Sequence, residues 1–111
     1  MKITIHSGSL NRFHQNMVLV QIEETKLTRY FPILQDAEIA AEILRIVDSD
    51  TTEIDSVSIF GGDGVITLNT NNTEKVYNTA EKGSAQKIAN FVLDVVDALK
   101  EKKENGYSRV V

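Results

Sequence analysis

The 111-residue chain contains no cysteine, and this absence removes several classes of chemistry at once. Without a thiol there is no disulfide bond, no cysteine nucleophile and no thiolate ligand for a metal ion. A chain without disulfides is typical of a reducing compartment, so we predict a cytoplasmic location.

Long apolar runs and an excess of basic residues are also missing. No stretch approaches the roughly 20 apolar residues that a membrane-spanning helix needs, and residues 1–6 alternate in polarity, unlike a signal peptide. Lys and Arg number 12 against 16 Asp and Glu, which gives a formal net charge of −4. Such a balance repels phosphate backbones, so we predict neither a membrane nor nucleic acid as a partner.

Residues that carry catalysis are few. His6 and His14 are the only histidines, and no motif or nearby third ligand makes them a metal site. Residues 61–64 read Gly-Gly-Asp-Gly, but a phosphate-binding loop would lead into a helix, whereas here a strand pattern follows. We interpret this segment as a hairpin turn. The sequence indicates no pair of side chains placed for general acid–base catalysis. We therefore predict that the protein is not an enzyme and uses no cofactor.

Hydrophobic periodicity is the strongest positive signal. Residues 84–103 predict an α-helix whose apolar stripe consists of Ile88, Phe91, Val92, Val95, Val96 and Leu99. Residues 36–48 predict a shorter helix with Asp36 as its N-terminal cap. Asn105 and Gly106 are typical of a helix end, which leaves residues 104–111 as a tail.

Short alternating segments predict six strands, at residues 2–7, 17–24, 26–33, 54–60, 65–69 and 74–79. Close turns between them favour two antiparallel meanders. The two helix sequences, residues 39–48 and 88–97, are identical at five of ten positions, and Val18 and Tyr30 each align with the same residue type 47 positions later. Shared helical composition is the other explanation for this likeness.

We therefore predict one α+β domain over residues 1–111, built as a tandem β-β-β-α duplication with halves at about 1–49 and 54–103. The expected architecture is one mainly antiparallel sheet of about six strands, with two helices on one face.

Residues 17–22 look apolar on both faces of their strand, whereas the aligned strand at residues 65–69 has one half-polar face. A strand with two apolar faces needs two covers. We therefore predict that Val18, Val20 and Ile22 form an interface with a second copy of the chain or with a partner protein. The alternative is that residues 8–16 or the C-terminal tail fold over this row.

Cations near aromatic rings suggest a second kind of site. An arginine beside an aromatic ring can hold a planar anion such as a nucleotide. The candidate residues for such a ligand site, at a cleft between the halves or between subunits, are Arg12, His14, Arg29, Tyr30, Tyr77 and Arg109.

The functional prediction follows from these observations. We expect a small interaction protein that inhibits or regulates a protein partner, acts as a homodimer, and resembles the accessory proteins of phages in size and acidity. Acidic residues are dense between positions 23 and 53, so a basic partner surface is one option. Binding or sequestering a small anionic ligand is the alternative function.

Overall fold

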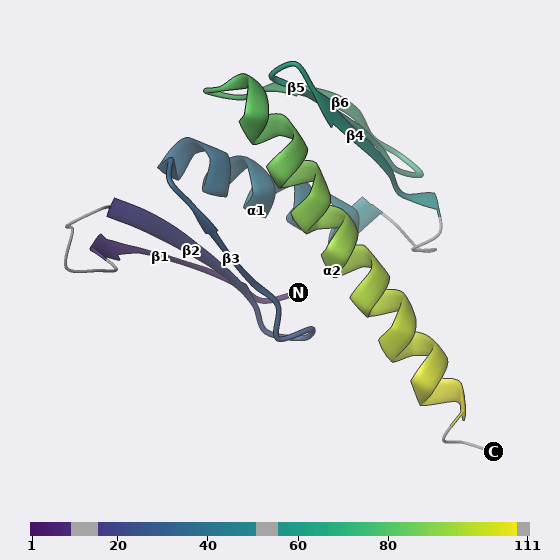
Figure 1. Ribbon diagram of the computed structural model, residues 1–111. Helices are drawn as coiled ribbons and strands as arrows, with labels where there is room; N and C mark the ends of the chain where they lie inside the picture. Colours follow the sequence, from purple (N-terminus) through teal and green to yellow (C-terminus); the bar gives the residue numbers. More distant parts are fainter. Residues whose placement is uncertain (10–15, 51–55, 109–111) are drawn as a thin grey trace.

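In the computed structural model the order strand, strand, strand, helix occurs twice (Figure 1). The structure describes residues 1–9, 16–50 and 56–108, and side chains within residues 1–6, 18–49 and 56–101. The first half consists of β1 (Ile3–Ser9), β2 (Asn16–Ile22), β3 (Thr28–Phe31) and α1 (Leu34–Asp50). The second consists of β4 (Ser58–Gly62), β5 (Val65–Asn69), β6 (Glu74–Asn78) and α2 (Lys82–Ser108). The predicted α+β class is confirmed, whereas common ancestry of the halves stays a prediction.

The strands form two separate antiparallel sheets of three strands each, so the predicted single six-stranded sheet is wrong. The N-terminal sheet has the order β1-β2-β3, and the C-terminal sheet has the order β4-β5-β6. Turn signals in the sequence define pairing within each meander, but they do not say whether the two meanders pair with each other. Here the helices lie between them.

Both helices lie in one layer between the two sheets (Figure 1). The N-terminal sheet packs mainly on α1, the C-terminal sheet packs on α2, and the helices pack on each other. The buried face of each helix is wider than a single stripe. On α1 the almost completely buried residues are Ala37, Ala40, Ala41, Ile43, Leu44 and Val47. A helix covered from two sides needs this wide apolar face.

The buried faces of the two helices coincide when their residues are matched 48 positions apart. The matched pairs are Asp36 and Ser84, Ala37 and Ala85, Ala40 and Ile88, Ala41 and Ala89, Ile43 and Phe91, Leu44 and Val92, and Val47 and Val95. The sequence alignment placed Ile39 on Ile88, one residue away from this match. The alignment by residue identity is therefore wrong by one position. It matches the exposed Glu42 with the buried Phe91.

The strand β2 faces the helices with Val18, Val20 and Ile22, which are 5%, 0% and 0% exposed. The predicted exposure of this row is therefore wrong, since the helix layer of the same chain covers it. Its outer neighbours are half-buried Leu19 and exposed Gln21. Burying the β-branched row avoids the cost of enclosing the polar amide of Gln21. A one-residue change of register exchanges the two faces of a strand, which is how the alignment misassigned them.

The turn at residues 63–64 is a two-residue hairpin loop, as the glycine-rich sequence predicts. Gly62 pairs with Val65 across the turn, and both Asp63 and Gly64 have positive φ, at 53° and 78°. Two successive positive φ values match the right-handed twist of the flanking strands.

The helix α2 continues through Asn105 and Gly106 to Ser108, so the predicted helix end before residue 104 is wrong. Glycine lowers helix stability by only about 1 kcal/mol, whereas each added residue gains a backbone hydrogen bond. The outer turns of α2 project beyond both sheets (Figure 1).

At Gly61 the C-terminal sheet lies directly against the backbone of α2. A Cβ atom at this position would overlap the backbone carbonyl of Ala85 and would lie 2.9 Å from the Cβ atom of Ala89. The contact involves helix backbone, which cannot rotate away as a side chain could. Close packing of strand on helix therefore requires glycine here.

We predict that Gly61→Ala lowers the free energy of unfolding by about 1–3 kcal/mol, because the added methyl group overpacks the interface with α2. Urea unfolding measures the change. Gly83→Ala is the matched control, because a Cβ at Gly83 meets no atom within 4 Å and alanine favours the helix. Equal stability of wild type and Gly61→Ala would contradict this packing.

Phe91 joins the halves at the centre of the helix layer. Its ring is fully buried and packs edge-to-face against Phe31 of β3, with ring centroids 5.9 Å apart. Phe31, on the third strand of the first half, therefore contacts the helix of the second half.

We predict that Phe91→Ala lowers the free energy of unfolding by about 3–5 kcal/mol, because it leaves a cavity at this junction. Chemical denaturation measures the loss. Leu93→Ala is the control, since Leu93 lies on the same helix with 38% exposure and its truncation leaves no enclosed cavity. A cost below about 1 kcal/mol for Phe91→Ala would contradict the position of this ring in the core.

Candidate functional site

The structure does not bring the predicted ligand-binding residues together. Arg12, His14 and Arg109 lie outside the described residues. Arg29 and Tyr30 are neighbours on β3 and therefore point to opposite faces of the N-terminal sheet. Tyr77 lies on the helix side of the other sheet. The described candidates thus do not share a cleft, and binding of an anionic ligand stays a prediction.

Arg29 takes part in the packing between the halves. One of its guanidinium nitrogens lies 2.7 Å from Oδ2 of Asp94 on α2, and the guanidinium carbon lies 5.3 Å from the centroid of the Phe91 ring. The arginine therefore meets an aromatic ring, as the sequence suggested, but the ring belongs to the core and a carboxylate already accepts the hydrogen bond.

A related contact occurs in the second half. Lys75 of β6 donates a hydrogen bond of 3.1 Å to Oε1 of Glu42 on α1, and this bond raises the pKa of Lys75. Its Nζ also lies 5.0 Å from the centroid of the Tyr77 ring. In each half, a basic side chain on the third strand therefore forms an ion pair with the helix of the other half.

Tyr77 is buried, and its hydroxyl makes no hydrogen bond of good geometry to a described residue, although Lys75 and Glu42 lie close enough to influence its pKa. Burial, followed by the negative charge of Glu42, raises the pKa of Tyr77, while Lys75 opposes the shift. The ring belongs to the buried core of the protein.

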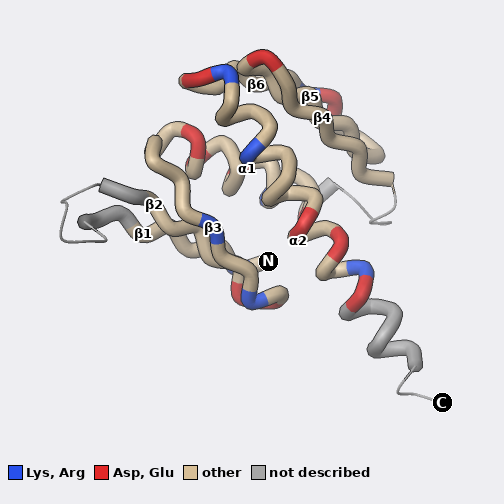
Figure 2. Tube along the Cα trace, in the orientation of Figure 1, with Lys and Arg blue, Asp and Glu red and all other residues tan. Residues whose placement is uncertain are grey.

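The described acidic residues between positions 23 and 49 lie on different parts of the molecule. Glu42 pairs with Lys75, and Glu23 lies 3.8 Å from Lys2 on the other side of the molecule. Asp36 is buried in the first turn of α1. Figure 2 shows the described acidic positions distributed over several elements.

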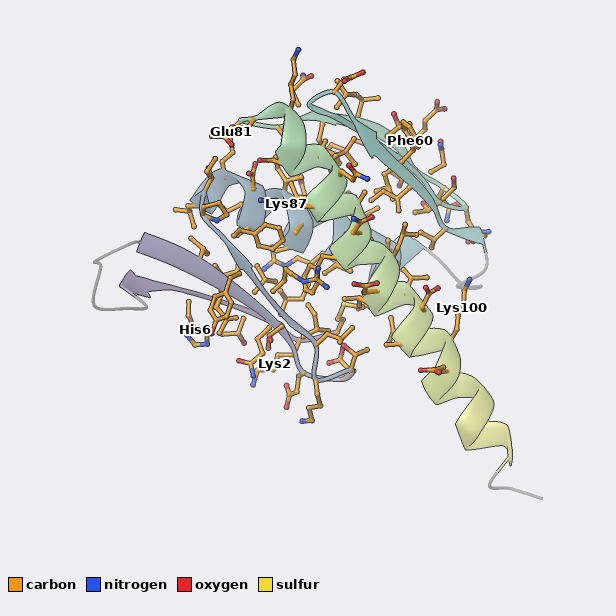
Figure 3. The ribbon with its side chains drawn as sticks, viewed as in Figure 1. Lys2, His6, Phe60, Glu81, Lys87 and Lys100 are labelled. Carbon is orange, nitrogen blue, oxygen red and sulfur yellow. The ribbon has the colours of Figure 1, made fainter. Side chains whose placement is uncertain are left out.

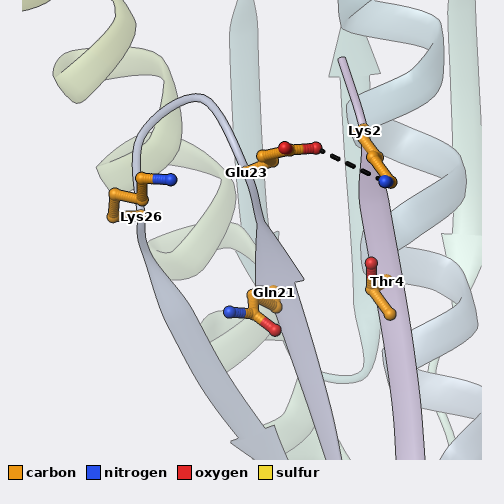
Figure 4. Close-up of a pocket in the computed structure, with 5 residues that line it drawn as sticks. All are labelled: Lys2, Thr4, Gln21, Glu23 and Lys26. Carbon is orange, nitrogen blue, oxygen red and sulfur yellow. Dashed lines mark ion pairs between the residues drawn. The ribbon is translucent and has the colours of Figure 1, made fainter.

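A shallow recess lies on the outer side of the N-terminal sheet (Figure 4). Its volume is about 270 Å³, and it is lined by Lys2, Thr4, Gln21, Glu23 and Lys26. The Lys2 ammonium lies 3.8 Å from the Glu23 carboxylate, so part of the positive charge is already offset. The recess gives two lysines and little enclosure to a ligand.

The outer face of the C-terminal sheet is the most exposed apolar surface among the described side chains. We call it the Phe60 face, and it comprises Ser58, Phe60, Gly62, Val65, Thr67, Asn69, Glu74, Val76 and Asn78. Phe60 is 74% exposed, Val76 is 58% exposed and Val65 is 37% exposed. Figure 3 shows Phe60 on the side of the sheet away from α2.

Strand pairing places these side chains in one continuous patch. Phe60 pairs with Thr67, and Thr67 pairs with Val76 on the other side, so the three residues form a row across the sheet. The Phe60 ring lies beside Gly62, where an added Cβ would be 3.5 Å from the ring. Glycine therefore leaves the ring room to lie along β4.

The Phe60 face carries little charge. Glu74 is the only ionisable side chain on its strand positions, and Lys75 points to the helix side, where it pairs with Glu42. A mostly neutral face with an exposed aromatic ring has the composition of a protein interface core, from which charged residues are depleted.

Sequence reasoning identified the half-polar face of residues 65–69 but missed Phe60 and Val76. Ile59 and Phe60 are both large and apolar, so alternation does not show which one faces the core. The small residue Gly61, which faces α2, is the signal that could have assigned Ile59 inward and Phe60 outward.

The described part of the chain lacks the features of two other kinds of site. It contains no group of three His, Cys, Asp or Glu residues that could hold a metal ion. Within the same residues, no helix has the length and apolarity needed to cross a membrane. No protein-family model, curated protein or solved structure matches the chain.

We predict that Tyr77→Phe raises the free energy of unfolding by about 1 kcal/mol at neutral pH, because it removes a buried hydroxyl without a partner. The pKa of Tyr77 is raised in the folded state. Deprotonation of Tyr77 therefore favours the unfolded state, and wild type loses stability as the pH rises from the unfolded pKa of about 10 through the folded pKa. The variant should lose less stability than wild type above about pH 10.

Urea unfolding at neutral and alkaline pH tests both parts of this prediction. Tyr30→Phe is the control, because Tyr30 is 50% exposed and its hydroxyl can contact water in both states. A loss of stability in Tyr77→Phe at neutral pH would show that the hydroxyl makes a favourable interaction.

Proposed function

We propose that this chain is a non-enzymatic protein-binding module that inhibits or regulates a partner by docking through the Phe60 face. The observation that carries the proposal is the exposure of Phe60 and Val76, which flank Thr67 in one row across the outer face of the sheet. Burial of apolar surface contributes about 25 cal/mol of free energy for each Å² removed from water. Phe60 and Val76 are the two most exposed large apolar side chains among the described residues.

The size of the patch supports this role. From their exposed fractions, Phe60, Val65 and Val76 together present roughly 300 Å² of apolar surface, which is in the range of the functional patches of monomeric proteins. A phenylalanine near the centre of such a patch can act as an anchor residue for a partner pocket. Ser58, Asn69 and Asn78 supply polar groups at its rim.

The shape of the face favours a protein over a small molecule. Small ligands bind in concave sites that bury most of their surface, whereas the Phe60 face is the outer side of a three-stranded sheet. A folded partner can cover such a surface with side chains of its own. We therefore place the binding function here and not in the shallow recess beside Lys2.

An affinity-capture experiment tests the proposal. The intact chain, Phe60→Ser and Tyr30→Ser are purified with the same tag, shown to be folded by thermal unfolding, and incubated with extract of the source cells. Quantitative mass spectrometry then compares the captured proteins. Tyr30→Ser is the matched control, because it removes an exposed aromatic side chain from the outer face of the other sheet.

We expect Phe60→Ser to reduce capture of specific partners at least about tenfold, as loss of an interface anchor does. Tyr30→Ser should retain them. If both variants capture the same proteins as the intact chain in the same amounts, the Phe60 face is not the docking surface.

A further inference from the structure

We propose that a second copy of this chain occupies the Phe60 face, so that two C-terminal sheets pack face to face around a two-fold axis. This inference rests on the proposed function, because it takes the Phe60 face to be a docking surface. It assigns the occupant, the relative orientation of the two copies and the residues that meet.

The middle row of the face is complementary in size to its own copy. A two-fold axis parallel to the strands and passing by Thr67 places β4 of one copy over β6 of the other, since β5 is the central strand. Phe60 then faces Val76 of the second copy, and Val76 faces the second Phe60. A large side chain meets a smaller one twice, which is the packing that allows two sheets to interdigitate.

The polar positions are complementary under the same axis. Ser58, Asn69 and Glu74 lie in one row across the three strands, with Asn69 in the middle. The two-fold rotation therefore places the Glu74 carboxylate opposite the Ser58 hydroxyl of the second copy. The two Glu74 side chains do not meet, and each carboxylate gains a hydroxyl donor. Val65 faces Val65 of the second copy, which extends the apolar contact.

The area of the face predicts the strength of the dimer. Three strands about 4.8 Å apart and five residues of about 3.4 Å each form a surface of about 14 Å by 17 Å. With side-chain relief included, this buries roughly 500 Å² per copy, or about 1,000 Å² in total, which is below the range of stable specific interfaces and in the range of weak ones. We therefore expect a weak dimer with a dissociation constant in the micromolar range.

Charge distinguishes this occupant from a basic partner. Each copy carries a formal charge of −4, so two copies repel each other and added salt should strengthen the dimer by screening. A complex held by attraction between an acidic face and a basic partner would instead weaken with salt.

Sedimentation equilibrium of the full chain, from about 1 to 300 µM, spans the expected dissociation constant. We expect reversible dimers, no larger species, and a dissociation constant that falls with added sodium chloride. Phe60→Ser should raise the dissociation constant at least about tenfold, while Tyr30→Ser leaves it unchanged. A monomer throughout this range, or equal effects of both variants, would overturn the proposal.

A charge pair tests the orientation. Ser58→Arg places a guanidinium opposite Glu74 of the second copy, twice in each dimer, whereas Asn78→Arg makes the same change in net charge at a position that faces Gly62. Ser58→Arg should therefore tighten the dimer several-fold more than Asn78→Arg. Equal effects, or a larger effect of Asn78→Arg, would overturn this two-fold arrangement.

The dimer and the docking function can fail separately. A strictly monomeric chain whose Phe60→Ser variant still loses captured proteins would overturn self-association and leave the docking function supported. A dimer that depends on Phe60, with unchanged capture of other proteins, would support self-association and contradict docking of a separate partner through this face.

Discussion

The burial of two sheets against one shared helix layer is the constraint on which the rest of the structure depends. Each sheet has three strands and one buried apolar face, and neither can enclose that face alone. The helices α1 and α2 cover both, so each helix must be apolar over a wide part of its circumference. Their many small residues, such as Ala37, Ala41 and Ala89, allow the layers to approach closely.

The same constraint explains why polar contacts cross between the halves. Arg29 reaches Asp94 on α2, and Lys75 reaches Glu42 on α1. All four side chains are partly exposed, and exposed ion pairs contribute at most about 1 kcal/mol each. Apolar contacts such as that between Phe31 and Phe91 therefore supply most of the stability, while the ion pairs favour one alignment of each third strand on the opposite helix.

Local elements could be predicted from the sequence because their signals are local. Alternation located the strands, Asp63 and Gly64 located a hairpin, and the stripe around Phe91 located α2. The separation into two sheets could not be predicted in this way. It depends on which layer the helices occupy, and that is decided by the total apolar surface of both halves and not by any short segment.

The face assignments failed for a related reason. Tyr30 and Tyr77 align by identity, yet Tyr30 is exposed and Tyr77 is buried; Phe31 is the residue that occupies the position equivalent to Tyr77. An aromatic residue fits both a core and an interface. Identity between halves therefore cannot set the register of a strand, whereas the burial pattern can. Because of this one-residue error, the core residues Val18, Val20 and Ile22 were predicted to form an interface.

The two halves bury equivalent residues but expose different ones, and the proposed docking function rests on this asymmetry. The row that matches Phe60, Thr67 and Val76 in the N-terminal sheet consists of His6, Leu19 and Tyr30. Packing on the helices constrains the inner faces of both sheets in the same way, but it places no such demand on the outer faces. An exposed phenylalanine on one outer face, where folding gains little from it, is therefore not explained by packing within the chain, and it supports the proposal that a partner covers this face.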